Sequence, residues 1–133
     1  MIRTLLTILI ITFFITPVHA GEVDGKGLEC TRGDEQIYYR FSEGRVFLLQ
    51  VIDKTPLRIS ENDLGLYYAS VEKIWWTDQL TMHTELYRKS LKLDYGNSGL
   101  INYICQVRTP EEIETALQKE IDALKEKMKD NKI

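Results

Sequence analysis

Alternation of hydrophobic and polar positions runs through most of the chain and predicts short antiparallel strands. The clearest signal is two β-rich runs, 36–41 and 45–52, separated by Ser-Glu-Gly. Such a pair predicts a hairpin, with either Glu43-Gly44 or a three-residue loop at its tip. The two loops differ by one position in register and therefore in which residues face one another. With Glu43-Gly44 as the loop, the facing pairs are Phe41 with Val46 and Tyr39 with Leu48.

Further strands are predicted on both sides of this hairpin. Residues 53–65 are predicted to form a loop that contains one short strand at most, at 57–59. Residues 89–90 are predicted to form a bend or turn. In the last strand we expect Ile101, Tyr103, Cys105 and Val107 to face the core. The remaining strand segments are 28–32, 66–70 and 71–78 (two strands or one bent strand), 84–95 and 100–107.

The pattern changes to a helical period at Thr109. Thr109 suits the N-cap, Pro110 the first helical position, and Glu112 completes a capping box. Apolar residues then recur every three or four positions and form one stripe. Its members are Ile113, Leu117, Ile121, Leu124 and Met128.

The predicted fold is therefore mainly β, a small antiparallel barrel or sandwich of about six to eight strands with one C-terminal amphipathic helix. We expect a β-domain over 21–108 and the helix over 109–133. The stripe favours packing of the helix on its own sheet. The alternative is a structural or assembly protein that forms homo-oligomers through residues 110–130, because the stripe is nearly heptad-spaced.

The N-terminus indicates export. Residues 1–20 have the basic start, the apolar run and the small residues before Gly21 that are typical of a secretory signal peptide. The apolar run of about twelve residues is short for a membrane span, which needs roughly 20; an uncleaved anchor is the alternative. We expect a periplasmic or secreted protein, with a mobile lead-in at 21–27.

The predicted mature protein is mildly acidic. Cleavage of the signal peptide removes Arg3 and leaves 17 − 1 = 16 basic against 20 acidic residues, a net charge of −4. This net charge argues against nucleic acid as a partner.

Two cysteines, Cys30 and Cys105, lie near opposite ends of the predicted strand region. In an oxidising compartment such a pair is expected to form a disulfide. The bond would join the first strand to the last, and the chain-entropy model gives a loop of about 75 residues roughly 4.5 kcal/mol of stabilisation. The alternative is a pair of buried free thiols or a reactive pair.

The chain has three aromatic doublets, pairs of adjacent aromatic residues: Tyr38-Tyr39, Tyr67-Tyr68 and Trp75-Trp76. Neighbours in a strand point to opposite faces, so if one ring of a doublet enters the core, the other must lie outside it. The helix could cover the outer rings, the rings could be half-exposed, or they could bind a protein or a glycan. The candidate contact residues are the doublet members Tyr38, Tyr67, Tyr68, Trp75 and Trp76.

Catalytic signals are weak. The predicted mature chain has one histidine, His83, and no metal-ligand spacing, phosphate loop or nucleophile elbow. We therefore assign no catalytic residue, metal or cofactor and expect a non-enzymatic protein.

Four segments have a distinctive order along the chain: Leu-Glu-Cys at 28–30, Lys-Ile-Trp-Trp at 73–76, Glu-Leu-Tyr-Arg-Lys-Ser at 85–90 and Tyr-Ile-Cys-Gln-Val at 103–107. This layout resembles that of the small exported bacterial C-type lysozyme inhibitors of the membrane-bound and periplasmic kind. The resemblance implies an eight-stranded barrel and an inhibitor-like, macromolecule-binding role in the cell envelope. The Ser-Gly-x-x-Tyr loop of that family is absent from residues 62–70, so the resemblance assigns no inhibitory residue. The chain equally resembles other small exported bacterial proteins.

Overall fold

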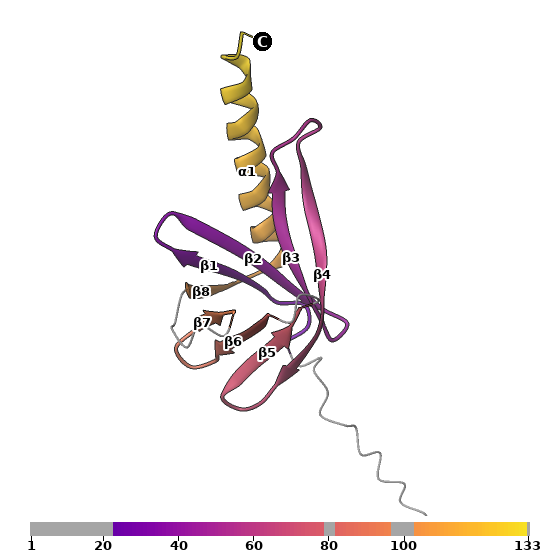
Figure 1. Cartoon of the computed structure of the whole chain (residues 1–133), viewed down its shortest axis with the longest axis vertical. Helices are drawn as coiled ribbons and strands as arrows, with labels where there is room; N and C mark the ends of the chain where they lie inside the picture. The colour runs from indigo at the N-terminus through magenta and orange to yellow at the C-terminus, as the bar shows by residue number, and fades with distance from the viewer. Residues whose placement is uncertain (1–22, 79–81, 97–102, 133) are drawn as a thin grey trace, which may run out of the picture.

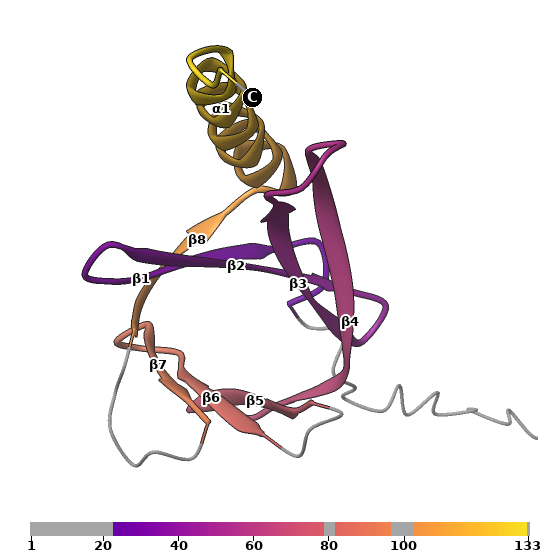
Figure 2. The same ribbon diagram turned by 45° about the horizontal axis from the view of Figure 1, so that its top comes forward.

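A computed structural model gives the structure of the chain and describes residues 23–78, 82–96 and 103–132. The predicted signal peptide at 1–20 lies outside the described residues. Eight antiparallel strands, each paired with its neighbours in sequence, close into a barrel through pairing of the first strand with the last (Figure 2). The strands are β1 (Gly27–Arg32), β2 (Glu35–Ser42), β3 (Arg45–Ile52), β4 (Arg58–Ala69), β5 (Lys73–Thr77), β6 (His83–Tyr87), β7 (Lys92–Tyr95) and β8 (Tyr103–Arg108). The barrel alternative of the predicted fold class is confirmed.

The β2–β3 hairpin has the two-residue loop. Glu43 and Gly44 both have positive φ, 53° and 71°, as a type I′ turn requires. Phe41 consequently pairs with Val46 and Tyr39 with Leu48. The inward residues of this hairpin join a core that fills the barrel and includes Tyr67, Trp76 and Leu93.

Strand β4 corrects the prediction for residues 53–65. The polar stretch Ser60–Asp63 reads as a loop, yet it belongs to a twelve-residue strand that pairs with β3 over residues 58–66 and with β5 over residues 67–69. Its side chains are largely exposed because the β3–β4 hairpin projects beyond the barrel beside the helix (Figure 1). Ion pairs Arg40–Glu61 and Arg45–Asp63 tie this strand to β2 and β3. Backbone pairing and surface ion pairs therefore stabilise this part of β4, which lacks the alternation of apolar and polar residues by which a strand is recognised in a sequence.

The helix α1 (Pro110–Lys129) begins as predicted. Thr109 is the N-cap, and its side chain and that of Glu112 form both bonds of the capping box. The helix packs on the outer face of its own barrel, where Ile113 and Leu117 cover Tyr38 and Leu49. Leu124 is half-buried and Met128 is 43% exposed, so the apolar stripe continues past the barrel. Within the part of the chain that the structure describes, no helix combines the length and apolar character needed to cross a bilayer.

The disulfide closes the seam between the two ends of the sheet. Cys30 of β1 and Cys105 of β8 are direct partners in the strand register and are bonded to each other. The predicted pairing is confirmed. On β8, Tyr103 and Cys105 face the core as predicted, but Val107 is half-exposed because it lies at the barrel end; Ile101 is outside the described residues.

The lead-in is not mobile over residues 23–27, and that prediction is wrong. Val23 is buried against the core, and Gly25 N–H donates to Phe41 O at 2.8 Å. Asp24 accepts hydrogen bonds from Gly44 N–H and, at 2.6 Å, from the hydroxyl of Tyr67. The lead-in therefore folds across one end of the barrel and is fixed there.

Candidate functional site

The three aromatic doublets separate into different environments. Tyr39, Tyr67 and Trp76 are buried in the barrel; Tyr39 and Trp76 meet edge to face, with ring centroids 5.1 Å apart. Tyr38 points outward but is buried beneath α1. Of the five candidate contact residues, the structure therefore leaves Tyr68 and Trp75 at the surface and gives Tyr67, Trp76 and Tyr38 packing roles.

Tyr68 and Trp75 form a stacked pair on the outside of the barrel. They are direct cross-strand partners on β4 and β5, their ring centroids are 5.9 Å apart, and their planes differ by 25°. Tyr68 is 51% exposed and Trp75 is half-buried. Leu66, two residues before Tyr68 on the same face, is also exposed. We call Leu66, Tyr68 and Trp75 the outer aromatic patch.

The strand registers place a polar cluster next to this patch. Glu85 of β6 is the direct partner of Trp75 on the side away from Tyr68. Its Oε1 lies 3.0 Å from Nε2 of His83 and accepts from the ammonium of Lys73 at 3.2 Å, and its Oε2 accepts from the hydroxyl of Tyr87 at 3.3 Å. The hydrogen bond with His83, together with Lys73, lowers the pKa of Glu85 against the opposing effect of burial. The patch is thus bordered by an ionised carboxylate that is held in one orientation.

Sequence reasoning missed this cluster. His83 and Glu85 are two residues apart in a strand and so share a face, which is a readable signal, but their partner Lys73 is brought in by the β5–β6 register. Nδ1 of His83 also lies 3.2 Å from the hydroxyl oxygen of Thr77. The resulting Thr77–His83–Glu85 chain has the order of a nucleophile, a base and an orienting acid.

The hydrogen-bonded series of Thr77, His83 and Glu85 lies along the outer surface of the barrel strands. Acyl-transfer catalysis also needs oxyanion donors and a recess that limits water, and the outer face of a barrel wall does not by itself provide them. Among the described residues, no group of three or more His, Cys, Asp or Glu side chains could hold a metal ion.

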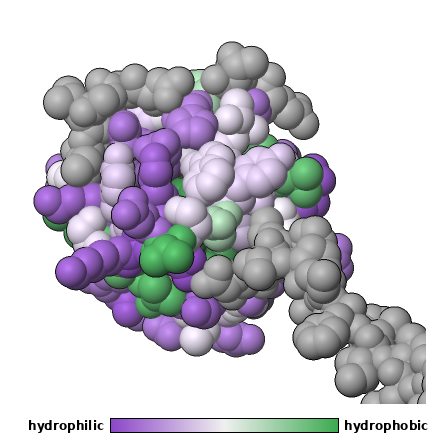
Figure 3. All heavy atoms as spheres, turned by 90° about the horizontal axis from the view of Figure 1, so that it is seen from below, coloured by the Kyte–Doolittle hydropathy of each residue, from purple (hydrophilic) through white to green (hydrophobic). Residues whose placement is uncertain are grey.

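Hydropathy is distributed unevenly over the surface. Seen from below, small hydrophobic patches lie beside hydrophilic side chains, with side chains of intermediate hydropathy gathered between them (Figure 3). Val71, on the turn that joins β4 to β5, is 94% exposed, so the end of the hairpin that carries the outer aromatic patch also presents an aliphatic side chain. Exposed apolar groups with a polar border are typical of interaction surfaces.

Comparison of the chain with protein-family models, with curated proteins and with solved structures finds no match.

Proposed function

We propose that the protein is an exported, non-enzymatic binding module that contacts a protein partner through the outer aromatic patch. The observation that carries this proposal is the stacked, surface-exposed pair of Tyr68 and Trp75. Tyr and Trp are enriched among the residues that dominate binding energy at interfaces. Because each ring already rests on the other, less side-chain freedom is lost on binding than for an isolated exposed ring.

The border of the patch supports specificity. Glu85, Lys73 and His83 form a charged, hydrogen-bonded edge beside Trp75. A polar rim around an apolar centre selects partners with complementary charge. Leu66 and Val71 are aliphatic, and their exposure favours a protein over a glycan as the partner. An apolar side chain of a protein partner would be stabilised by burial against the aliphatic groups as well as against the aromatic rings.

Export is part of the proposal and rests on two observations. The disulfide Cys30–Cys105 is typical of oxidising compartments, and residues 1–20 have the pattern of a signal peptide. The resemblance to lysozyme inhibitors makes C-type lysozymes the first partners to test.

The assembly alternative has weaker support. Ile113, Leu117 and Ile121, the first three members of the helical stripe, are buried, which leaves Leu124 and Met128 for contacts between chains. Two such residues supply the two apolar positions of only one heptad of a coiled-coil seam.

The test is co-purification from envelope extracts and from lysozyme preparations with three forms of the mature protein. They are the wild type, the double variant Tyr68→Ala/Trp75→Ala, and the control Ile104→Ala, which removes an apolar side chain that is 62% exposed on β8. We expect the wild type and the control to retain the same partner and the double variant to lose it. Retention of that partner by the folded double variant would refute the proposal, and retention of glycans alone would reassign the patch to sugar binding.

A further inference from the structure

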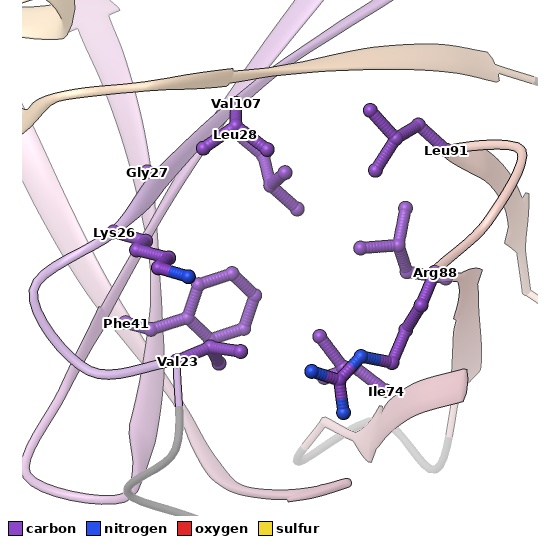
Figure 4. Close-up of a pocket in the computed structure, with 10 residues that line it drawn as sticks. Val23, Lys26, Gly27, Leu28, Phe41, Ile74, Arg88, Leu91 and Val107 are labelled. Carbon is purple, nitrogen blue, oxygen red and sulfur yellow. The ribbon is translucent and has the colours of Figure 1, made fainter. Parts of the chain in front are cut away.

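A cavity opens at the end of the barrel where β1 begins and β8 ends (Figure 4). Its volume is about 170 Å³. The apolar side chains of its wall come from the lead-in, from five strands (β1, β2, β5, β6 and β8) and from the turn after β6. They include Val23, Leu28, Phe41, Ile74, Leu86 and Leu91. The cavity is on a different part of the molecule from the outer aromatic patch, none of whose residues lines it.

The lead-in forms one wall, and its backbone is fixed on the barrel. Phe41 N–H donates to Lys26 O at 3.0 Å, and the bond from Gly25 N–H to Phe41 O completes the pair. Asp24, the acid among the described residues of this segment, is directed to Gly44 and Tyr67 and does not line the cavity. Val23 and Lys26 therefore stand at the cavity in defined positions.

The opposite wall contains a strained residue. Leu91 has a φ of 57°, a left-handed conformation that is unfavourable for a residue with a branched side chain. Two backbone bonds of 2.8 Å hold it, from Leu91 N–H to Tyr87 O and from Cys105 N–H to Leu91 O. Strain of this kind is often retained where a side chain must be placed for function. Here it accompanies a leucine that packs on the core and lines the cavity.

Both ionisable residues that line the cavity are basic. Figure 4 shows Lys26 entering from one wall and Arg88 from the opposite wall. Arg88 donates from one guanidinium nitrogen to Ser70 O at 2.7 Å, which fixes the orientation of the group. A carboxylate is the natural complement of an ammonium and a guanidinium.

We propose that this cavity binds a small apolar carboxylic acid, with the apolar group inside the barrel end and the carboxylate between Lys26 and Arg88. Size sets the class of ligand, since an apolar protein cavity of about 150 Å³ accommodates benzene. A phenyl or branched aliphatic group fits a cavity of about 170 Å³, whereas a long acyl chain exceeds it. Pockets with apolar walls and a few convergent polar groups at barrel mouths are typical ligand sites.

The experiment measures binding of phenylacetate to the full mature protein by calorimetry and by chemical-shift mapping. The matched probes are phenylacetamide, which lacks the charge, and acetate, which lacks the apolar group. We expect phenylacetate to bind at the cavity about tenfold more tightly than phenylacetamide, since a hydrogen bond to a charged group contributes roughly that much. Acetate should bind more weakly than phenylacetate.

Variants separate this site from the rest of the molecule. The double variant Lys26→Gln/Arg88→Gln should lower the affinity for phenylacetate to that for phenylacetamide. Lys26 is exposed, so the single variant Lys26→Gln should keep the fold and provides a second test of the charge. Leu86→Phe should fill the cavity and abolish binding of both phenyl probes. Trp75→Ala should leave binding unchanged, so this result is independent of the proposed partner surface. The proposal is overturned if neither phenyl probe binds at millimolar concentration, if the amide binds as tightly as the acid, or if shifts map to Trp75.

Discussion

Trp75 and Trp76 are adjacent in β5 and occupy opposite environments. Trp76 is 1% exposed and contacts the rings of Tyr39 and Phe41 inside the barrel, whereas Trp75 stacks on Tyr68 outside it. One ring therefore contributes to the core and the other is available for contact with a partner.

The two tryptophans should differ in their contribution to stability. Trp76→Ala empties the centre of the core and should cost about 3–5 kcal/mol of unfolding free energy. Trp75→Ala removes a half-exposed stack and should cost only about 0.5–1.5 kcal/mol. Urea unfolding of the two variants measures the difference. Equal losses would mean that the outer ring is a structural element.

The disulfide should carry a large share of the stability. Cys30 and Cys105 are separated by 75 residues, and closure of such a loop in the unfolded chain is worth roughly 4.5 kcal/mol. The double variant Cys30→Ser/Cys105→Ser should therefore unfold at a much lower urea concentration than the wild type. Reduction of the wild type provides the control and should give the same shift. A midpoint unchanged by either treatment would contradict the role assigned to the seam.

Helix docking depends on the absence of a side chain at Gly27. A Cβ at this position would collide with Cδ1 of Ile113 and would come within 3.1 Å of Arg108 O. Gly27→Ala should destabilise the protein by about 1–3 kcal/mol through overpacking. Ile113→Val removes the colliding methyl group, so in a double-mutant cycle the combined loss should be smaller than the sum of the single losses. Simple additivity would show that α1 does not rest on β1 in this way.

Glu85 should make the fold sensitive to acid. Its pKa is lowered in the folded state, chiefly by the bond with His83, so its ionised form stabilises the fold above the ordinary value of 4.5. This contribution is lost as the pH falls through the lower pKa of the folded protein. Glu85→Gln should therefore be less stable than the wild type near neutral pH, and the two should converge at lower pH. Melting temperatures between pH 3 and 7 test this, and a constant difference would contradict it.

The parts of the fold that were predictable have local causes. The two β-rich runs around Ser-Glu-Gly predicted the β2–β3 hairpin, although the structure was needed to choose between its two possible registers. The capping residues Thr109 and Glu112 located the start of the helix. The cysteine pair followed from the even count and the expected compartment. Each of these signals lies within a few residues or requires no knowledge of packing.

The remaining features depend on contacts between distant segments. The length of β4 could not be read from Ser60–Asp63, because pairing with β3 overrides the polar composition. The patch beside Trp75 required the β4–β5 and β5–β6 registers, which place Tyr68 on one side of it and Glu85 on the other. The position of Val23 required knowledge of the barrel end that it covers.

The most direct test of the binding-module account is site-specific photo-crosslinking of the protein in its natural compartment. A photoreactive phenylalanine derivative at position 68 should yield one discrete adduct with a partner protein. The same group at position 104, on the exposed outer face of β8, should yield no such adduct. Absence of an adduct at position 68 in folded protein at its normal level, or the same adduct at both positions, would contradict the account.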